Sequence, residues 1–196
     1  MARRRGWLPV NWPIHATNRG QDRRQLFFEP SDYRDFLGLL ERARGRFEVD
    51  VLGYAIMPNH FHLVLSQRSE GAVSAYLHWA CGCKACTFRS TTGTAGAGHV
   101  FQRRYWSQVL SDGQHYLTAL RYVEANPLRA RLVSRAEDWP WGSLWERMTR
   151  ERCLLAASPV PLPPEWLGVV NGIQATEEME TCRRRTRSRR LEPVRS

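Results

Sequence analysis

Two histidines one residue apart are the first side chains in this sequence that could do chemistry together. His60 and His62 follow the turn-forming pair Pro58-Asn59 and lie in an otherwise apolar segment, residues 60–65. Side chains alternate between the two faces of a strand, so both imidazoles should lie on one face and the apolar side chains on the other. Two imidazoles on a rigid strand can bind one divalent metal ion. The alternative is a pair of structural histidines at the start of a strand.

A second pair of polar side chains lies near the end of a predicted helix. Ser111-Asp112 supply helix-capping side chains, and apolar residues at helical spacing predict a helix that runs to Asn126, before Pro127. Tyr122 and Asn126 are four residues apart, which predicts that they share a face of this helix. Because the residue before a proline is pushed out of the helical region, Asn126 should lie in or just beyond the last turn.

The elements that would position these side chains can be read from periodicity and turn residues. The pattern predicts strands over residues 12–18, 49–57 and 60–66, a helix over 32–44, and a further strand after residue 104. The short break between residues 57 and 60 predicts an antiparallel hairpin. A helix should begin at Ala72, with a flexible loop at residues 91–98. Its apolar stripe is predicted to comprise Ala72, Tyr76, Trp79, Cys83 and Cys86.

The length and composition predict one domain with a basic surface. The 196 residues, 42% of them hydrophobic, suffice for one sizeable core. We expect a single α+β domain over residues 1–150 and a loosely ordered tail over 151–196, proline-rich and then basic. Lys and Arg number 29 against 19 Asp and Glu, a formal charge of +10. Because arginine matches phosphate oxygens, nucleic acid is the first partner to consider and an anionic membrane surface the second. The alternative is a soluble protein from an arginine-rich proteome.

Arginine and aromatic residues gather in two segments and beside the tyrosine pair. Aromatic rings stack on exposed bases and arginines hold the phosphate backbone, a combination suited to single-stranded nucleic acid. An ordinary strand with a basic edge is the alternative for the second segment. The candidate DNA-binding residues are Arg19, Arg23, Arg24, Arg103, Arg104, Tyr105, Trp106, Arg121 and Arg129.

The cysteine pattern does not resemble that of a secreted disulfide protein. Three of the five cysteines, Cys81, Cys83 and Cys86, lie close together. They are best explained as small buried side chains, and a zinc site completed by His78 or His99 is the alternative. No run of 18 apolar residues is present, so we expect a cytoplasmic protein without a membrane span.

Six segments of the chain together resemble a known family. They are His15-Ala-Thr-Asn-Arg-Gly, Asp32-Tyr-Arg-Asp-Phe-Leu, Tyr54-Ala-Ile-Met-Pro-Asn-His-Phe-His-Leu, Phe101-Gln-Arg-Arg-Tyr, Arg121-Tyr-Val-Glu-Ala-Asn-Pro-Leu-Arg-Ala and Trp139-Pro-Trp. In this order and at these spacings they resemble the REP-associated tyrosine transposases, which belong to the single-tyrosine class of HUH nucleases. One departure is Gln21, where the family often has asparagine.

The resemblance implies a fold, a site and an activity. It implies a ferredoxin-like antiparallel sheet with packed helices, in agreement with the predicted order of elements. It implies that His60, His62 and Asn126 bind Mg²⁺ or Mn²⁺ and that Tyr122 is the nucleophile. The expected activity is nicking and strand transfer of single-stranded DNA at REP-type hairpins through a covalent 5′-phosphotyrosine, by a monomer or homodimer at the bacterial nucleoid. A domesticated protein that binds hairpins without cleaving them is the alternative.

The implied chemistry suits these residue types. Phosphodiester cleavage needs an in-line nucleophile and positive charge near the non-bridging oxygens, which a divalent metal ion supplies. Free tyrosine has a pKa of about 10, so its proton must be removed or its pKa lowered by nearby positive charge. Histidine and amide ligands should favour Mn²⁺ over Mg²⁺.

Overall fold

The chain folds around one four-stranded antiparallel sheet, and the computed structural model describes residues 8–94, 98–102 and 104–172. The strands are β1 (Ile14–Arg19), β2 (Val49–Met57), β3 (His60–Gln67) and β4 (Trp106–Val109), in the spatial order β2-β3-β1-β4. Helix α1 (Pro30–Arg46) connects β1 to β2, and α2 (Ala72–Thr92) connects β3 to β4. This order and connectivity confirm the predicted α+β, ferredoxin-like domain.

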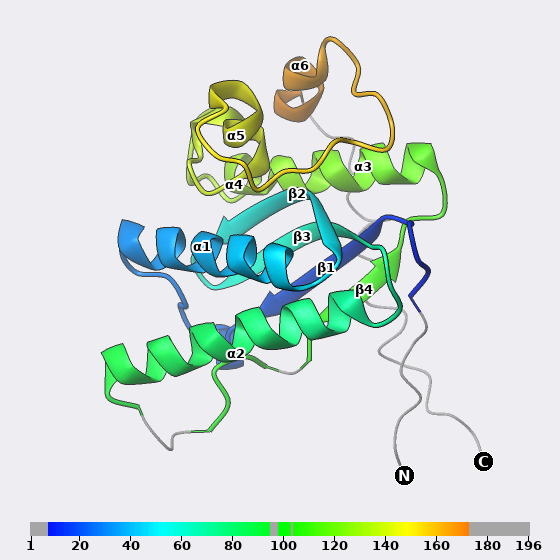
Figure 1. Cartoon of the computed structure of the whole chain (residues 1–196). Coiled ribbons are helices and arrows are strands. Elements are labelled where there is room, and N and C mark those ends of the chain that lie inside the picture. Colours follow the sequence, from blue (N-terminus) through cyan, green and yellow to red (C-terminus); the bar gives the residue numbers. More distant parts are fainter. Residues whose placement is uncertain (1–7, 95–97, 103, 173–196) are drawn as a thin grey trace, which may run out of the picture.

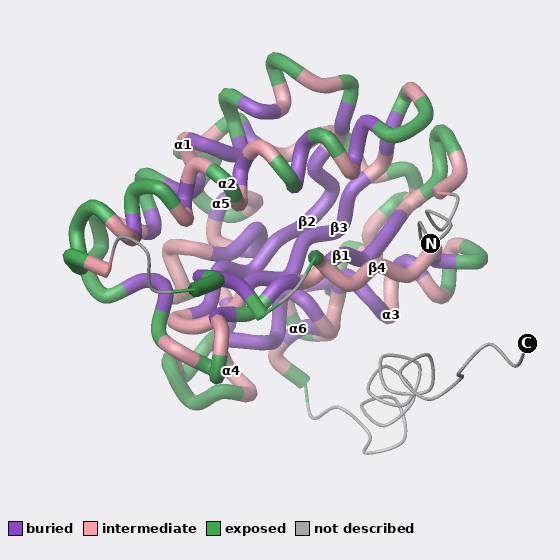
Figure 2. Tube along the Cα trace, turned by 90° about the horizontal axis from the view of Figure 1, so that it is seen from below, coloured by how far each residue is buried: buried purple, intermediate pink, exposed green. Residues whose placement is uncertain are grey.

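Helices cover both faces of the sheet (Figure 1). On one face α1 and α2 pack with Ile14, Phe61 and Leu63 in a first apolar cluster. On the other, α3 (Gly113–Glu124) packs with Ala55 and Val64 in a second cluster. Figure 2 shows β1, β2 and β3 buried along most of their length, whereas β4 at the edge is only half-buried.

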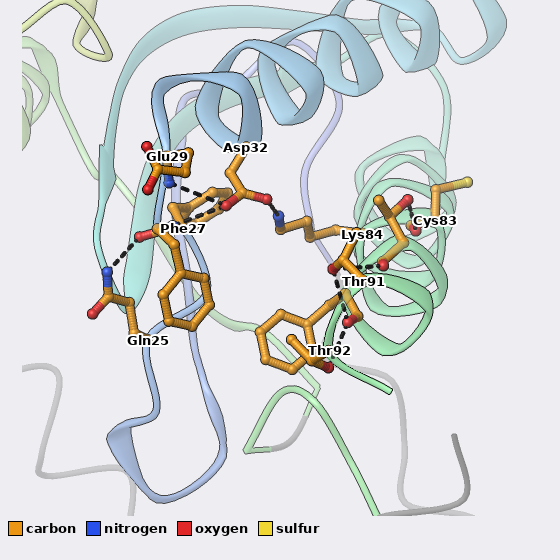
Figure 3. Close-up of polar contacts among 11 residues, drawn as sticks. Gln25, Phe27, Glu29, Asp32, Cys83, Lys84, Thr91 and Thr92 are labelled. Atoms are coloured by element: carbon orange, nitrogen blue, oxygen red, sulfur yellow. Dashed lines mark hydrogen bonds and ion pairs between the residues drawn. The ribbon is translucent and has the colours of Figure 1, made fainter. Parts of the chain in front are cut away.

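An ion pair between buried Lys84 and half-buried Asp32 joins the two helices of the first face. Proline opens α1, and the Asp32 carboxylate caps it by accepting hydrogen bonds from the backbone amides of Phe28 and Glu29. The Lys84 ammonium of α2 lies 2.9 Å from Asp32 and 4.7 Å from the centre of the Phe27 ring (Figure 3). Asp32 therefore both caps α1 and anchors α2.

The buried face of α2 differs from the predicted stripe. Trp79 and Cys83 are half-buried and Cys86 is exposed, so these three do not form the core face. The helix also continues through Thr92, into the segment expected to be a loop. The predicted stripe is rotated relative to the observed buried face because a charged residue was not expected in the core. The ion pair with Asp32 allows Lys84 to be buried there. The buried residues of α2 are Ala72, Val73, Tyr76, Leu77, Ala80, Lys84 and Phe88.

Beyond α3 the chain continues in short elements that contribute to both apolar clusters. These are α4 (Asn126–Arg129), the 3-10 helix η2 (Ala136–Asp138), α5 (Ser143–Thr149) and α6 (Trp166–Asn171). Leu154, Trp166 and Val170 are buried, so packing continues past residue 150 into the segment expected to be a tail. The basic run at residues 183–190 lies outside the described residues. No helix in the described ranges is long and apolar enough to cross a membrane.

Gly53 allows α3 to approach the sheet closely. A Cβ atom at this position would lie 2.3 Å from Cδ1 of Leu120, a side chain that is fully buried. We expect Gly53→Ala to lower the free energy of unfolding by about 1–3 kcal/mol through overpacking, as measured by chemical denaturation. Gly45 of α1 has no neighbour within 4 Å of such a Cβ, so Gly45→Ala should instead stabilise the helix by about 0.5 kcal/mol. Equal effects of the two substitutions would contradict this interpretation.

Candidate active site

The hairpin of β2 and β3 places both histidines on the face that α3 covers. Met57 pairs with His60 across the two-residue turn, and Ala55 pairs with His62. Met57 and Ala55 belong to the apolar cluster of α3, and directly opposed residues of a sheet share a face. The imidazoles of His60 and His62 have ring centres 5.1 Å apart, with planes at 83°. The predicted alternation of the histidine strand is therefore confirmed.

Tyr122 of α3 lies directly against His62. The two ring centres are 5.6 Å apart and the rings meet edge to face at 87°. The Arg129 guanidinium of α4 stacks over the same tyrosine, with its carbon 4.7 Å from the ring centre. Nη1 of Arg129 is buried and has no hydrogen-bond partner among the described residues. One chain thus supplies the histidines, the tyrosine and an arginine with a free donor.

His15 of β1 joins this cluster, and sequence reasoning did not assign it to the site. Its Nε2 lies 3.0 Å from Nδ1 of His62, and its ring centre is 6.2 Å from that of Tyr122 and 5.6 Å from that of Trp106. The available signal was strand alternation, because His15 and Thr17 are polar and alternate with the apolar Ile14 and Ala16 along the strand. Only the pairing of β1 with β3 brings that face beside His62.

Burial keeps the three imidazoles neutral. Desolvation lowers the pKa of His15 to about 4, with a smaller contribution from the charge of His115. Desolvation, followed by the charge of Arg19, lowers the pKa of His60 to about 4. The pKa of His62 falls well below its ordinary value, first through desolvation and then through the neighbouring histidines and arginines. At neutral pH these rings need lose no proton to bind a metal ion.

Asn126 lies next to Tyr122, although not within the same helix. Helix α3 ends at Glu124, and Asn126 begins the short α4. Asn126 therefore lies just beyond the last turn of α3, as predicted. The Asn126 side chain is buried, and its Nδ2 donates to the Tyr122 carbonyl oxygen at 2.9 Å. This hydrogen bond leaves Oδ1 as the atom that Asn126 can offer to a ligand.

The imidazole nitrogens of His60 and His62 and the amide oxygen of Asn126 suit a divalent metal ion that accepts both nitrogen and oxygen ligands. Within the described ranges no group of three or more His, Cys, Asp or Glu side chains could hold a metal ion. A metal site here must therefore combine His60 and His62 with a different donor, for which the Asn126 amide is suited. The same finding leaves the zinc alternative without a ligand cluster in this part of the chain, where Cys81, Cys83 and Cys86 are free.

A tight basic loop borders the histidine end of the site. Arg19 pairs with His60 across the sheet, and the 3-10 helix η1 (Gln21–Arg23) follows directly. Asp22 and Arg23 have left-handed backbone angles, with φ of 51° and 61°. Such angles cost about 1 kcal/mol each outside glycine. A hydrogen bond connects the loop to the hairpin turn: Nδ2 of Asn59 donates to the Arg23 carbonyl oxygen at 3.1 Å.

The other predicted DNA-binding residues lie in different places. Trp106 lies beside His15, on the face of the sheet that carries His60 and His62. Tyr105 instead packs against the first apolar cluster, and its hydroxyl forms a hydrogen bond with the Ser74 hydroxyl of α2. The Arg121 guanidinium lies 3.5 Å from the Gly172 carbonyl oxygen, near the end of α6. Arg104 is exposed, Arg24 is half-buried, and Arg103 lies outside the described residues.

Comparison with known proteins identifies a family for this fold. The family model for IS200-like transposases matches residues 10–126, more than half of the chain. A REP-associated tyrosine transposase of Escherichia coli is 21% identical over 133 residues, covering 68% of this chain and 70% of that protein. A Haemophilus influenzae protein provisionally given the same name is 24% identical over 132 residues, covering 63% of this chain and 74% of its own.

A solved structure of a REP-associated tyrosine transposase bound to a REP hairpin has the same fold. It superposes with a TM-score of 0.61 at 16% identity and covers 82% of this chain and 94% of its own. The resemblance inferred from the six sequence segments is thereby confirmed. The chain belongs to the family of IS200-like transposases, and the curated relatives it matches are named REP-associated tyrosine transposases.

Proposed function

We propose that the protein nicks single-stranded DNA and transfers the strand through a covalent 5′-phosphotyrosine on Tyr122, with Mg²⁺ or Mn²⁺ bound by His60, His62 and Asn126. The observation that carries the proposal is the edge-to-face contact between Tyr122 and His62, with ring centres 5.6 Å apart. It brings a nucleophile and a potential metal ligand together within one chain, so a monomer would suffice for catalysis. The family and the names of the relatives support a transposase.

The proposed reaction is an exchange of phosphodiester bonds. The Tyr122 oxygen attacks the phosphorus and gives up its proton, a tyrosine–phosphate bond forms, and the bond from phosphorus to the 3′ oxygen breaks. The leaving oxygen takes up a proton and becomes a free 3′-hydroxyl. Attack by a 3′-hydroxyl on the phosphotyrosine reverses the reaction and joins the strands without ATP. A bound divalent metal ion would supply positive charge at the non-bridging oxygens.

In this proposal, two arginines of the chain would hold the scissile phosphate. Arg129 presents its unpartnered Nη1 beside Tyr122, and exposed Arg19 lies opposite His60. A planar guanidinium can donate two hydrogen bonds to one phosphate. Arg19 and the η1 loop would continue the contact along the strand, and Trp106 would offer a face for a base. We infer that the substrate is a DNA hairpin of the kind named for the relatives.

The experiment that tests this function uses the purified full chain and an end-labelled hairpin oligonucleotide with single-stranded flanks. With Mn²⁺ present, we expect a protein–DNA product that survives denaturation and disappears after protease treatment, and a released fragment with a 3′-hydroxyl. Addition of EDTA should prevent both products. Tight hairpin binding without a covalent product in Mn²⁺ or Mg²⁺ would instead identify a non-cleaving hairpin-binding protein.

Arg129→Ala should slow covalent product formation by about 10²–10³-fold, because it removes the donor nearest the proposed phosphate position. Arg129→Lys should retain part of the rate, since lysine keeps the charge without the planar pair of donors. Initial rates on the labelled hairpin at saturating Mn²⁺ measure both effects. Arg42→Ala, on the exposed side of α1, removes the same charge from the opposite layer and is the control. An equal loss in both alanine variants would mean that only net charge matters.

A further inference from the structure

The Asn59 side chain determines which nitrogen of His60 carries the proton. Its Nδ2 donates to the Arg23 carbonyl oxygen, a contact that only the amino end of the amide can make. Its Oδ1 therefore faces His60 and lies 2.7 Å from the ring Nδ1. An amide oxygen is only an acceptor, so Nδ1 of His60 must be the protonated nitrogen. Because Nδ1 is occupied by this hydrogen bond, Nε2 is the nitrogen whose lone pair can bind a metal ion.

The His15 side chain contacts His62 at Nδ1, the same ring nitrogen that Asn59 contacts in His60. The hydrogen bond joins Nε2 of His15 to Nδ1 of His62 at 3.0 Å, and the planes of the two rings are 23° apart. One nitrogen of this pair donates and the other accepts. If Nδ1 of His62 is the donor, its Nε2 has a free lone pair; if Nε2 of His15 is the donor, Nε2 of neutral His62 is protonated and cannot bind a metal ion.

We propose that Asn59 and His15 are positioning residues that hold His60 and His62 in the tautomer protonated at Nδ1, so that Nε2 is the metal-binding atom of both. The inference rests on the metal site of the proposed function and names the residues that prepare it. It follows the general rule that a ligand histidine makes a hydrogen bond through its other nitrogen, which fixes both tautomer and ring orientation. Here one partner is a turn amide and the other is a buried imidazole of the neighbouring strand.

The arrangement also ties the histidines to the rest of the site. Asn59 forms hydrogen bonds with both His60 and the strained η1 loop. The loop that carries Arg23 and Arg24 is thereby held next to His60, a proposed metal ligand. His15 contacts His62 and has its ring near those of Tyr122 and Trp106. A change at either positioning residue should therefore affect the metal ligands without removing them.

The direct test is the ¹⁵N–¹H correlation spectrum of the histidine rings in the metal-free, full-length protein at pH 7. We expect the wild-type His60 and His62 to show the pattern of Nδ1–H tautomers. In Asn59→Ala, His60 should shift toward the Nε2–H tautomer, and in His15→Leu, His62 should do so. Asn59→Asp and His15→Gln retain an acceptor and should keep the wild-type pattern. His78→Ala, at an exposed position of α2, assigns one signal and is the control.

A second readout is Mn²⁺ affinity, followed by electron paramagnetic resonance of the free ion. Asn59→Ala and His15→Leu should each bind Mn²⁺ about 10–100-fold more weakly, whereas the two acceptor-retaining variants should bind nearly as well as the wild type. Thermal unfolding of each variant shows whether it is folded. An Nε2–H tautomer of either ring in the wild type, or tautomers and affinity unchanged in Asn59→Ala and His15→Leu, would overturn the proposal. Failure of the proposed function looks different: tautomers and Mn²⁺ binding as expected, but no covalent product.

Discussion

Tyr122→Phe should eliminate the covalent protein–DNA product while leaving hairpin binding close to that of the wild type. Phenylalanine keeps the ring that contacts His62 and the guanidinium of Arg129, so the shape of the site should be preserved. It lacks the oxygen that forms the bond to phosphorus, and no other group in the proposed mechanism replaces it. Denaturing gels of the labelled hairpin with Mn²⁺ measure the product, and native gels measure binding.

Tyr116→Phe is the matched control for this substitution. Tyr116 lies in the same helix, α3, and its hydroxyl bonds the Ser158 hydroxyl at 2.9 Å within the second apolar cluster. Removal of this hydroxyl should lower the free energy of unfolding by about 1 kcal/mol and leave the amount of covalent product unchanged. A covalent product from Tyr122→Phe at the wild-type level would mean that another residue is the nucleophile. Loss of product in both variants would point to a general defect of α3.

The secondary structure of this chain was predictable because its signals are local. The two-residue period of β3 and the Pro58-Asn59 break fixed the hairpin, and the helical spacing after Pro30 fixed α1. The shared face of His60 and His62 follows from the same period. Their proximity to Tyr122 did not follow from periodicity, and only the resemblance between sequence motifs indicated it before the structure was known.

The features that were missed depend on contacts between residues far apart in the chain. His15 and His62 are 47 residues apart, and their hydrogen bond exists only because β1 pairs with β3 in a particular register. Lys84 is buried because Asp32, 52 residues earlier, supplies its counter-charge. Periodicity cannot predict pairings of this kind, because the residues next to each partner in the sequence carry no information about the other partner.

His60→Ala should reduce metal-dependent cleavage by about 10²–10⁴-fold at low Mn²⁺, which corresponds to a loss of several kcal/mol of transition-state stabilisation. His60 is the better histidine to replace because it is half-buried at the edge of the site. His62, by contrast, packs against both His15 and Tyr122, so its removal would also disturb the nucleophile. Single-turnover rates over a Mn²⁺ titration measure the effect, with His78→Ala as the control.

The dependence on metal concentration separates a ligand from a structural histidine. If His60 binds the metal ion, the alanine variant should recover part of its rate at high Mn²⁺, because the remaining donors still form a weaker site. Recovery in Mg²⁺ should be smaller, since imidazole and amide donors suit Mn²⁺ better than the all-oxygen environment that Mg²⁺ prefers. A structural histidine would give a loss that no metal concentration restores and that is accompanied by a lower thermal unfolding temperature. A wild-type rate for His60→Ala at every Mn²⁺ concentration would remove His60 from the ligand set.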